Sequence, residues 1–324
     1  MNSGTDAILI ALQALGIGPG DEVISPAHNV AYTALAVNRL GAKNVFVDID
    51  PLTMLMDCDR IQDVITGSTR AIVPVHLYGQ MVNMKRVRDI ARANNLMVVE
   101  DAAQAHGALY DGHPPGYFSH AVAYSFYPTK NLGSLGEAGG ITTNIPSVAK
   151  AARQLRDGGR SDRYIHSLPG VNSVMDEIQA AVLRVKLKHL DLSNRKRCKL
   201  AFEYIKELSR IEDIRLQVWP QKVSPVYHLF VIRIKRRTAL MQWLKENEVP
   251  TLIHYPLTVP EQPVFVSECY EQGPFPHAQE ASRTVLSLPM FPDMSKKQQD
   301  WIIGKIKAFF DLPNNRKKLT CSTS

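Results

Sequence analysis

A lysine in a turn close to glycines is the residue best placed by its sequence context to do chemistry. Lys130 lies in the segment Ser125-Phe-Tyr-Pro-Thr-Lys-Asn-Leu-Gly133, after the apolar run Ala121–Phe126, which we expect to be a buried strand. An amine held there can form a Schiff base with a carbonyl group once burial near a cation lowers its pKa. A solvent-exposed turn lysine is the commoner fate of any single lysine, so this segment alone leaves both interpretations open.

A carboxylate follows a second apolar run. Asp101 lies in Val98-Val-Glu-Asp-Ala-Ala-Gln-Ala-His106, just beyond the expected buried strand Leu96–Val99. Open α/β sheets bind ligands outside the carboxyl ends of their strands, and a carboxylate there suits a cofactor ring nitrogen that must stay protonated. The alternative, that Asp101 caps a following helix, fits this segment equally well.

Small residues open the first expected helix. Ser3-Gly-Thr-Asp6 precedes Ile8, Leu12 and Leu15, which fall on one helix face, and Gly16-Ile-Gly-Pro-Gly20 ends that helix. A helix N-terminus offers free N–H groups and the positive end of the helix dipole, so small residues there can bind a phosphate. Ser-Gly-Thr is also a common helix cap. All three features together are much harder to obtain by accident than any one of them.

Strand-like runs alternate with helical stretches over the first 190 residues, and this alternation must position those side chains. It predicts a mostly parallel sheet covered on both faces. A helical pattern follows from Ser173 to about Leu190 and continues in broken form to about Leu208. The expected strands are Glu22–Ile24, Asn44–Val47, Ala71–Val75, Leu96–Val99, Ala121–Phe126 and Gly140–Thr143.

The order of elements then changes, which predicts a smaller α+β domain. The expected elements are a strand at Val226–Ile234, a helix at Ala239–Asn247, a short strand at Thr251–Ile253, a Pro-rich loop and a closing helix at Lys296–Phe310. We therefore expect a large domain over residues 1–192 and a small C-terminal domain over residues 193–313. Residues 314–324 lack apolar periodicity and are expected to be a disordered tail.

The bulk composition is ordinary for a globular chain and excludes several classes of protein. The 324 residues are 45% hydrophobic, and no apolar run approaches the roughly 20 residues of a membrane helix. The N-terminus shows no signal peptide. The four cysteines, Cys58, Cys198, Cys269 and Cys321, are scattered without a CxxC pair. This pattern favours a cytoplasmic protein with reduced thiols, and we predict no metal site.

Basic residues exceed acidic ones by 38 to 31, which gives a formal charge of +7. Much of the excess lies in Arg184–Lys199 and Arg316–Lys318. Nucleic-acid binding needs basic residues interleaved with stacking aromatics, or a known motif, and the sequence shows neither. We expect a solvated helix face, no nucleic-acid partner and no membrane partner, while an anionic small substrate stays compatible.

Specific motifs from residue 2 to about Phe310 carry a resemblance to a known family. They are Asn2-Ser-Gly-Thr-Asp-Ala7, Gly20-Asp-Glu-Val23, Val47-Asp-Ile-Asp-Pro51, Pro74-Val-His-Leu-Tyr-Gly-Gln80, Glu100-Asp-Ala-Ala-Gln-Ala-His106, Ser125–Gly133, Gly170-Val-Asn-Ser173 with Asp176-Glu-Ile-Gln-Ala-Ala181, His254-Tyr-Pro256 and Leu286-Ser-Leu-Pro-Met290. With them the chain resembles the DegT/DnrJ/EryC1/StrS family of pyridoxal-phosphate-dependent sugar aminotransferases. The resemblance implies an α/β fold of the aspartate-aminotransferase type (fold type I), with a mostly parallel sheet in a large domain and a smaller α+β C-terminal domain.

The resemblance also implies roles for the matching residues. Lys130 would hold pyridoxal 5'-phosphate through a Schiff base and move the proton between the donor and product carbons. Asp101 would pair with the pyridine nitrogen, and Gln104 would contact the 3-hydroxyl of the cofactor.

Phosphate and sugar contacts complete the implied site. The phosphate ligands would be Gly4, Thr5 and Ser125, joined by Asn172 from the partner subunit, which makes a homodimer with shared active sites the functional unit. Tyr127, His254 and Tyr255 are candidates for contacting the sugar. Ordinary packing of half-buried aromatic residues is the equally open alternative.

The sequence departs from the family pattern in two ways. In the family the Ser-Gly-Thr motif follows an N-terminal segment of several dozen residues that helps to build the dimer, whereas this sequence begins at the motif. Either its reading frame starts at an internal Met, or the protein lacks that segment. Val174 stands where an arginine is usual, and Val30 where many relatives carry a ring-stacking aromatic. His28, Tyr32 or an aliphatic side chain is left to contact the ring.

The predicted reaction is transfer of the amino group of L-glutamate to a keto sugar attached to a nucleotide diphosphate. The family's dehydratases carry histidine at the position of Lys130, which argues against dehydration. Two alternatives stay open: a truncated or degenerate cofactor-binding relative without full activity, and an aminotransferase for cyclitols or other keto acceptors.

Overall fold

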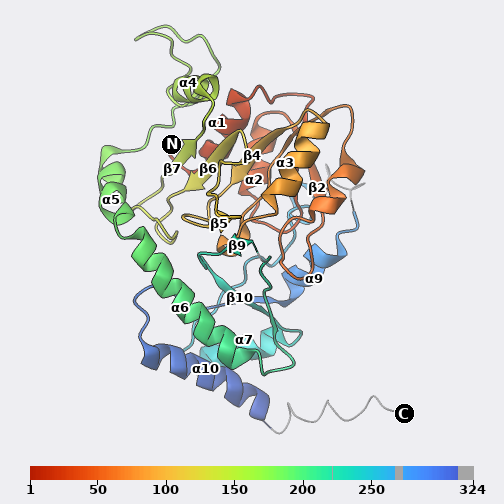
Figure 1. Ribbon diagram of the computed structural model, residues 1–324, viewed down its shortest axis with the longest axis vertical. Helices are drawn as coiled ribbons and strands as arrows, with labels where there is room; N and C mark the ends of the chain where they lie inside the picture. Colours follow the sequence, from red (N-terminus) through yellow and green to blue (C-terminus); the bar gives the residue numbers. More distant parts are fainter. Residues whose placement is uncertain (221, 267–272, 313–324) are drawn as a thin grey trace.

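The computed structural model describes residues 1–220, 222–266 and 273–312. A six-stranded sheet forms the centre of its larger part, which is the upper part in Figure 1. The strand order is β2-β1-β3-β4-β6-β7. Neighbouring strands from β2 to β6 are parallel, and β7 is antiparallel to β6. The mostly parallel sheet is thereby confirmed. The strands are β1 (Glu22–Pro26), β2 (Lys43–Val47), β3 (Thr69–Ile72), β4 (Met97–Asp101), β6 (Ala121–Ser125) and β7 (Gly139–Thr142).

Helices cover both faces of this sheet. On one face α1 (Gly4–Ala14) buries Ala7 to Leu12 in a cluster with Val99 and Ala121, which α4 (Pro146–Leu155) extends. On the other face α3 (Met84–Ala93) packs through Val87 and Ile90. Because both faces are covered, strands such as β1 are buried at every residue and lack polar alternation. The remaining elements of this part are α2 (Tyr32–Arg39) and the 3₁₀ turns η1 (Cys58–Arg60), η2 (Gln62–Val64) and η3 (Leu77–Gly79).

Two consecutive helices lead from the large sheet to the second part of the chain. The expected long, broken helix consists of α5 (Glu177–Leu187) and α6 (Leu190–Leu208), separated by Lys188 and His189. In Figure 1, α6 runs diagonally from α5 to the C-terminal elements. The domain boundary predicted at residue 192 falls inside α6, so this helix spans it, and the boundary stays a prediction.

The second part is a smaller α+β unit built on a three-stranded antiparallel sheet. Its strand order is β11-β10-β8, and α6, α7 and α10 bury Tyr204, Leu240 and Ile306 in a common core with Ile232 of β10. A two-stranded sheet, β5 with β9, links the two parts. The elements are β5 (Leu109–Tyr110), β8 (Arg215–Leu216), β9 (Val223–Ser224), β10 (Phe230–Arg233), α7 (Arg237–Glu246), α9 (Pro276–Thr284), β11 (Val285–Leu288) and α10 (Lys296–Asp311).

Several local expectations for this second part are wrong. The strand expected over Val226–Ile234 is only β10, and the one expected over Thr251–Ile253 is a single bridge between Leu252 and Ser287. The expected Pro-rich loop contains α9 and β11. β11 is a four-residue strand buried at every position, so it lacks the alternation that marks a strand in a sequence. The predicted tail, residues 314–324, lies outside the described residues, as do Cys269 and Cys321.

Within the described ranges, no helix is long and apolar enough to cross a membrane. The same residues contain no group of three or more His, Cys, Asp or Glu side chains arranged to hold a metal ion.

Candidate active site

The start of α1 meets the end of β6. Ser3 caps the helix, because its hydroxyl oxygen accepts a hydrogen bond from the Asp6 N–H at 3.1 Å and its carbonyl accepts one from Ala7. The N–H groups of Gly4 and Thr5 therefore have no partner within the helix. A Cβ atom on Gly4 would lie 2.7 Å from the Cβ of Ser125, so only glycine allows this approach. Two free amides and one hydroxyl thus share one corner, an arrangement that suits a phosphate.

Lys130 lies in a closed turn directly after β6. Its N–H donates to the Tyr127 carbonyl at 2.9 Å, and Ser134 N–H returns to the Phe126 carbonyl at 2.8 Å. A Cβ on Gly133 would lie 2.4 Å from the Pro128 carbonyl oxygen, so the turn needs glycine there. Burial lowers the pKa of the Lys130 amine, while Asp101 and Glu137 raise it, and the net result is a pKa below the ordinary lysine value. The amine therefore loses its proton more easily than a surface lysine does.

Asp101 ends β4 with its carboxylate oriented by two hydrogen bonds. One oxygen accepts from the Thr33 hydroxyl at 2.7 Å, and the other accepts from the Ala103 N–H at 3.1 Å. Asn29 in turn donates to Thr33 at 2.9 Å. No helix directly follows Asp101, so the alternative that Asp101 caps a helix is wrong. Its hydrogen bond from the Ala103 N–H instead stabilises a turn.

These groups line one pocket of about 900 Å³. Seven of the ten predicted site residues line it: Gly4, Thr5, Asp101, Ser125, Tyr127, Lys130 and Tyr255. The pocket lies at the carboxyl ends of β4 and β6, where their common direction brings Asp101 and the Lys130 turn together. A volume of this size accommodates a cofactor with a small substrate.

The other three predicted residues do not line the pocket. Gln104 is occupied, because its amide oxygen accepts from the Tyr78 N–H at 2.6 Å and its amide nitrogen donates to the Tyr255 hydroxyl at 3.1 Å. His254 has Nδ1 2.8 Å from the Ser287 hydroxyl. Asn172 is exposed and bonds through its carbonyl to the Asn2 side chain at 3.0 Å.

His28 is buried and does not line the pocket, so it does not face a bound cofactor ring. Its two ring nitrogens lie 3.3 Å from the Ser282 hydroxyl and 2.9 Å from the Tyr78 hydroxyl. Burial lowers the pKa of His28 to about 4, so the ring stays neutral behind the pocket wall. Val30 and Tyr32 both line the pocket. Of the three side chains considered from the sequence, His28 is excluded.

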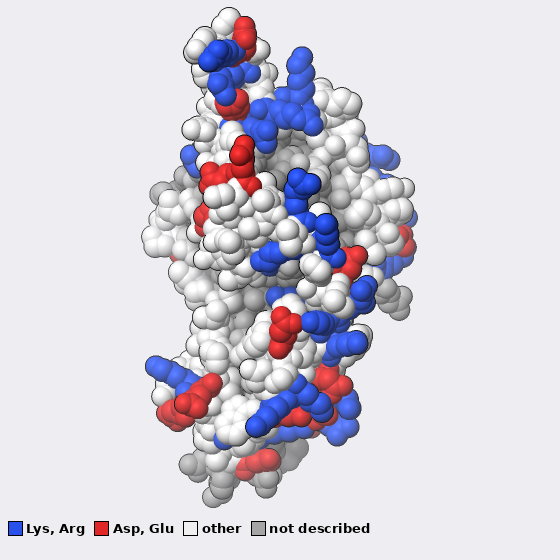
Figure 2. Space-filling model, turned by 90° about the vertical axis from the view of Figure 1, so that its left-hand side faces the viewer, with Lys and Arg blue, Asp and Glu red and all other residues white. Residues whose placement is uncertain are grey.

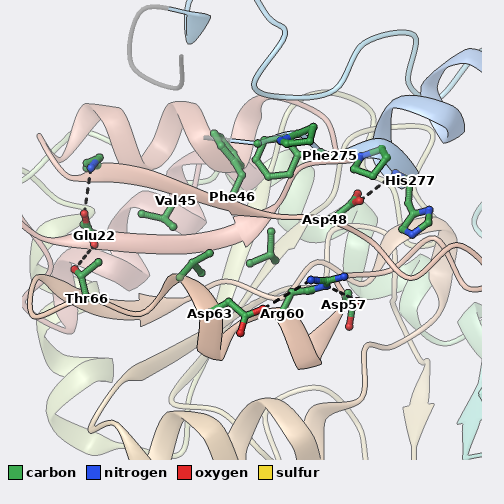
Figure 3. Close-up of a pocket in the computed structure, with 16 residues that line it drawn as sticks. Glu22, Val45, Phe46, Asp48, Asp57, Arg60, Asp63, Thr66, Phe275 and His277 are labelled. Atoms are coloured by element: carbon green, nitrogen blue, oxygen red, sulfur yellow. Dashed lines mark hydrogen bonds and ion pairs between the residues drawn. The ribbon is translucent and has the colours of Figure 1, made fainter. Parts of the chain in front are cut away.

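A second pocket, of about 560 Å³, lies beside the edge strand β2 and is shown in Figure 3. Its aromatic wall includes Phe46 and Phe275. Its charged groups are paired with one another, with a threonine hydroxyl or with backbone N–H groups: Glu22 with Lys43 and the Thr66 hydroxyl, Arg60 with Asp57 and Asp63, and Asp48 with the N–H groups of His277 and Ala278. Each of these pairs has a structural role, so the chemistry is assigned to the pocket around Lys130.

Comparison with known proteins agrees with this geometry. The sequence pattern of the DegT/DnrJ/EryC1/StrS aminotransferase family matches residues 1–307. The chain belongs to this family. Its α/β fold of the aspartate-aminotransferase type and its assignment as an aminotransferase are therefore confirmed.

Individual relatives are similar over nearly the whole chain. The "Pleiotropic regulatory protein" of Geobacillus stearothermophilus is 46% identical over 312 residues, covering 95% of this chain and 83% of the relative. The "dTDP-3-amino-3,4,6-trideoxy-alpha-D-glucose transaminase" of Streptomyces venezuelae is 43% identical over 307 residues, covering 95% and 81%. The crystal structure of S. venezuelae DesV "in complex with ketimine intermediate" has a TM-score of 0.94 at 42% identity, covering 96% of this chain and 84% of that one.

The cofactor of this aminotransferase is pyridoxal phosphate, as predicted, and solved structures similar to this chain hold it in its PMP and PLP forms. The residues of this chain fit that molecule. The unbonded amides at the start of α1 with Ser125 suit its phosphate, Asp101 suits a protonated ring nitrogen, and Lys130 suits its aldehyde, all around one pocket.

Two contributors to the site were missed by the sequence analysis. Thr33 orients the Asp101 carboxylate. Glu137 lines the pocket, and its charge raises the pKa of the Lys130 amine. Thr33 lies in the first turn of α2, next to Tyr32, which was considered from the sequence only for contact with the ring. Nothing in its spacing indicated a hydrogen bond to a residue 68 positions away.

Proposed function

We propose that this aminotransferase moves the amino group of L-glutamate onto a keto sugar carried by a nucleotide diphosphate. The observation that carries the proposal is the convergence of Lys130, Asp101 and the start of α1 on one pocket. Relatives named as dTDP- and UDP-sugar transaminases support the acceptor class. A relative from Bacillus subtilis named "3-oxo-glucose-6-phosphate:glutamate aminotransferase" supports glutamate as the donor. The free thiols Cys58 and Cys198 favour action in the cytoplasm.

Each residue has a defined task in this reaction. When bound, pyridoxal phosphate supplies the electron-withdrawing ring that stabilises charge on the carbon losing a proton. Burial lowers the pKa of the Lys130 amine. In its unprotonated form, Lys130 Nζ accepts the proton of the donor carbon and returns it to the acceptor carbon. Asp101 holds a cationic ring N–H, and the amides of Gly4 and Thr5 with the Ser125 hydroxyl hold the phosphate. Tyr127 and Tyr255 line the same pocket and are assigned to the sugar.

The experiment that tests this function separates the half-reactions. Purified protein loaded with pyridoxal phosphate is mixed with L-glutamate, and formation of 2-oxoglutarate is measured. The aminated protein is then offered dTDP- and UDP-linked keto sugars, a keto-sugar phosphate and a cyclitol ketone. We expect amine transfer to a nucleotide-linked sugar. Transfer only to the unlinked acceptors would contradict the acceptor class, and no half-reaction with glutamate would favour the degenerate-relative alternative.

We also propose a homodimer as the functional unit, with Asn172 of each subunit near the phosphate site of the other. Asn172 is exposed and lies outside the pocket of its own chain. Figure 2 shows the side of the molecule that carries α5, where wide uncharged areas separate groups of charged side chains. Exposed apolar residues gather near α5, as is typical of an interaction surface. They are Val174, Ile178, Val185, Leu187 and Leu192.

If the active site is shared between subunits, cofactor binding should stabilise the dimer and dimer formation should tighten cofactor binding. The reason is that a ligand that binds only the dimer shifts the monomer–dimer equilibrium toward the dimer. Sedimentation at several protein concentrations, with and without pyridoxal phosphate, measures this linkage. We expect Val185→Glu to dissociate the dimer and weaken cofactor binding. Leu52→Glu is the matched control, because Leu52 is 57% exposed, close to the 61% of Val185, and lies between β2 and η1. A monomer whose cofactor affinity is independent of protein concentration would rule out the shared site.

A further inference from the structure

The residue after Lys130 anchors the turn through its side chain. Asn131 Nδ2 donates to Asn194 Oδ1 at 2.9 Å and to the Val226 carbonyl at 3.0 Å, and its Oδ1 lies 3.1 Å from His228 Nδ1. Asn194 belongs to α6, while Val226 and His228 precede β10 (Figure 1). The turn that carries Lys130 is thus tied to the second half of the chain.

Backbone carbonyl groups fix the direction of every hydrogen bond in this network. Asn194 Nδ2 donates to the His106 carbonyl at 2.8 Å, and a carbonyl oxygen can only accept, so Asn194 Oδ1 faces Asn131. Asn131 Nδ2 uses its two hydrogens on Asn194 and on the Val226 carbonyl. Its Oδ1 is left to accept, so His228 Nδ1 must carry the proton. A neutral His228 is therefore the tautomer with hydrogen on Nδ1.

His228 is itself firmly placed and kept neutral. Its side chain is buried, and its carbonyl accepts from Arg197 Nη1 of α6 at 3.2 Å. Burial, followed by the charge of Lys130, holds the pKa of His228 well below its usual range. The other titratable groups that act on His228 are Arg197, His106 and His254, and those that act on Lys130 are Asp101 and Glu137.

We propose that Asn131 and His228 form a positioning pair for the Lys130 amine. The neutral His228 donates to Asn131, which holds the Lys130 turn against α6 and the segment before β10. The amine then stays half-buried beside Asp101. This inference rests on the proposed role of Lys130 as the cofactor lysine. Displacing a reacting group by about 1 Å can cost about 10²-fold in rate, so the anchor bears on reactivity as well as on stability.

The test compares two substitutions at His228 in the full chain. His228→Leu keeps the packing but removes the donor, whereas His228→Asn places an amide N–H at the position of Nδ1. The readout is the rate at which cofactor-free protein forms a borohydride-trappable bond to added pyridoxal phosphate, measured as a function of pH. We expect His228→Leu to slow this attachment by about 10- to 100-fold at neutral pH. Its pH midpoint should rise toward the value of about 10.4 of an exposed lysine. His228→Asn should stay close to the parent protein in both respects.

Controls separate positioning from simple destabilisation. Tyr204→Phe removes one buried hydrogen bond, from its hydroxyl to the Pro289 carbonyl at 2.8 Å, in the core of the second part. It should lower the melting temperature without changing the attachment rate or its midpoint. If His228→Leu does not fold, His228→Gln makes the same comparison, because its amide cannot occupy the Nδ1 position.

The outcomes distinguish this inference from the proposed function. Attachment in His228→Leu at the parental rate and midpoint would show that the pair is only structural and would overturn the inference. If the parent protein itself attaches the cofactor at a lysine other than Lys130, the proposed function fails first. Slow attachment in His228→Leu with recovery in His228→Asn supports the positioning pair.

Discussion

Lys130→Ala is expected to abolish both covalent attachment of pyridoxal phosphate and amine transfer. The same amine attaches the cofactor and carries the proton, and proton transfer alone contributes about 10²–10⁴ in rate. We therefore expect turnover to fall by at least about 10⁴-fold. Borohydride reduction of the wild-type protein, followed by peptide mapping, is expected to place the cofactor on Lys130.

The Lys130→Arg variant is the matched control for this prediction. Arginine keeps a long basic side chain in the half-buried turn but stays protonated, so it cannot bond to a carbonyl. It is expected to be as inactive as alanine while far-ultraviolet circular dichroism shows a folded chain. Recovery of the reduced cofactor on a different lysine would refute the assignment.

Asp101→Asn is expected to leave the cofactor bound and attached while slowing proton abstraction from glutamate by about 10²–10⁴-fold. Asparagine has nearly the same shape as aspartate but lacks the charge that keeps a ring nitrogen protonated. Single-turnover absorbance measurements with L-glutamate separate this chemical step from cofactor binding. Turnover close to that of the wild type would leave Asp101 with only its structural contacts to Ala103 and Thr33.

Thr33→Val tests whether the charge of Asp101 or its orientation matters more. It removes the 2.7 Å hydrogen bond to the carboxylate and leaves the charge in place. One lost hydrogen bond to a charged group corresponds to about 1.5–3 kcal/mol, which is roughly a 10- to 150-fold loss in the rate of proton abstraction from glutamate. A smaller effect than that of Asp101→Asn would identify the charge as the dominant factor.

Glycines at the site allow segments that are distant in the chain to approach one another closely. Gly4 lets α1 approach Ser125, and a Cβ on Gly139 would lie 2.1 Å from the Ser3 carbonyl oxygen. These close approaches bring the helix start, β6 and β7 together at one end of the sheet. The glycines were visible in the sequence as parts of motifs. Their partners became visible only when distant segments were brought into contact.

The sequence by itself determined the alternating strands and helices, and with them the placement of Asp101 at the end of β4 and of Lys130 just after β6. Parallel strands end at one edge of their sheet, so two residues that follow neighbouring strands must meet there. The motif resemblance then determined the family and the cofactor, because the residue types at matching positions are specific.

Only the tertiary structure decided how individual side chains are used. Gln104 and His28 were candidates for contacting the cofactor, yet packing directs their polar atoms to Tyr78, Tyr255 and Ser282. The same is true of β11 and α9, which form where buried contacts outweigh weak local preferences. β11 packs through Leu286 and Leu288 into the core of the second part, and α9 packs through Ala278 and Ala281 against the large sheet. Hydrogen-bond partners far apart in the chain depend on how segments pack together, and one sequence read by local pattern does not contain that information.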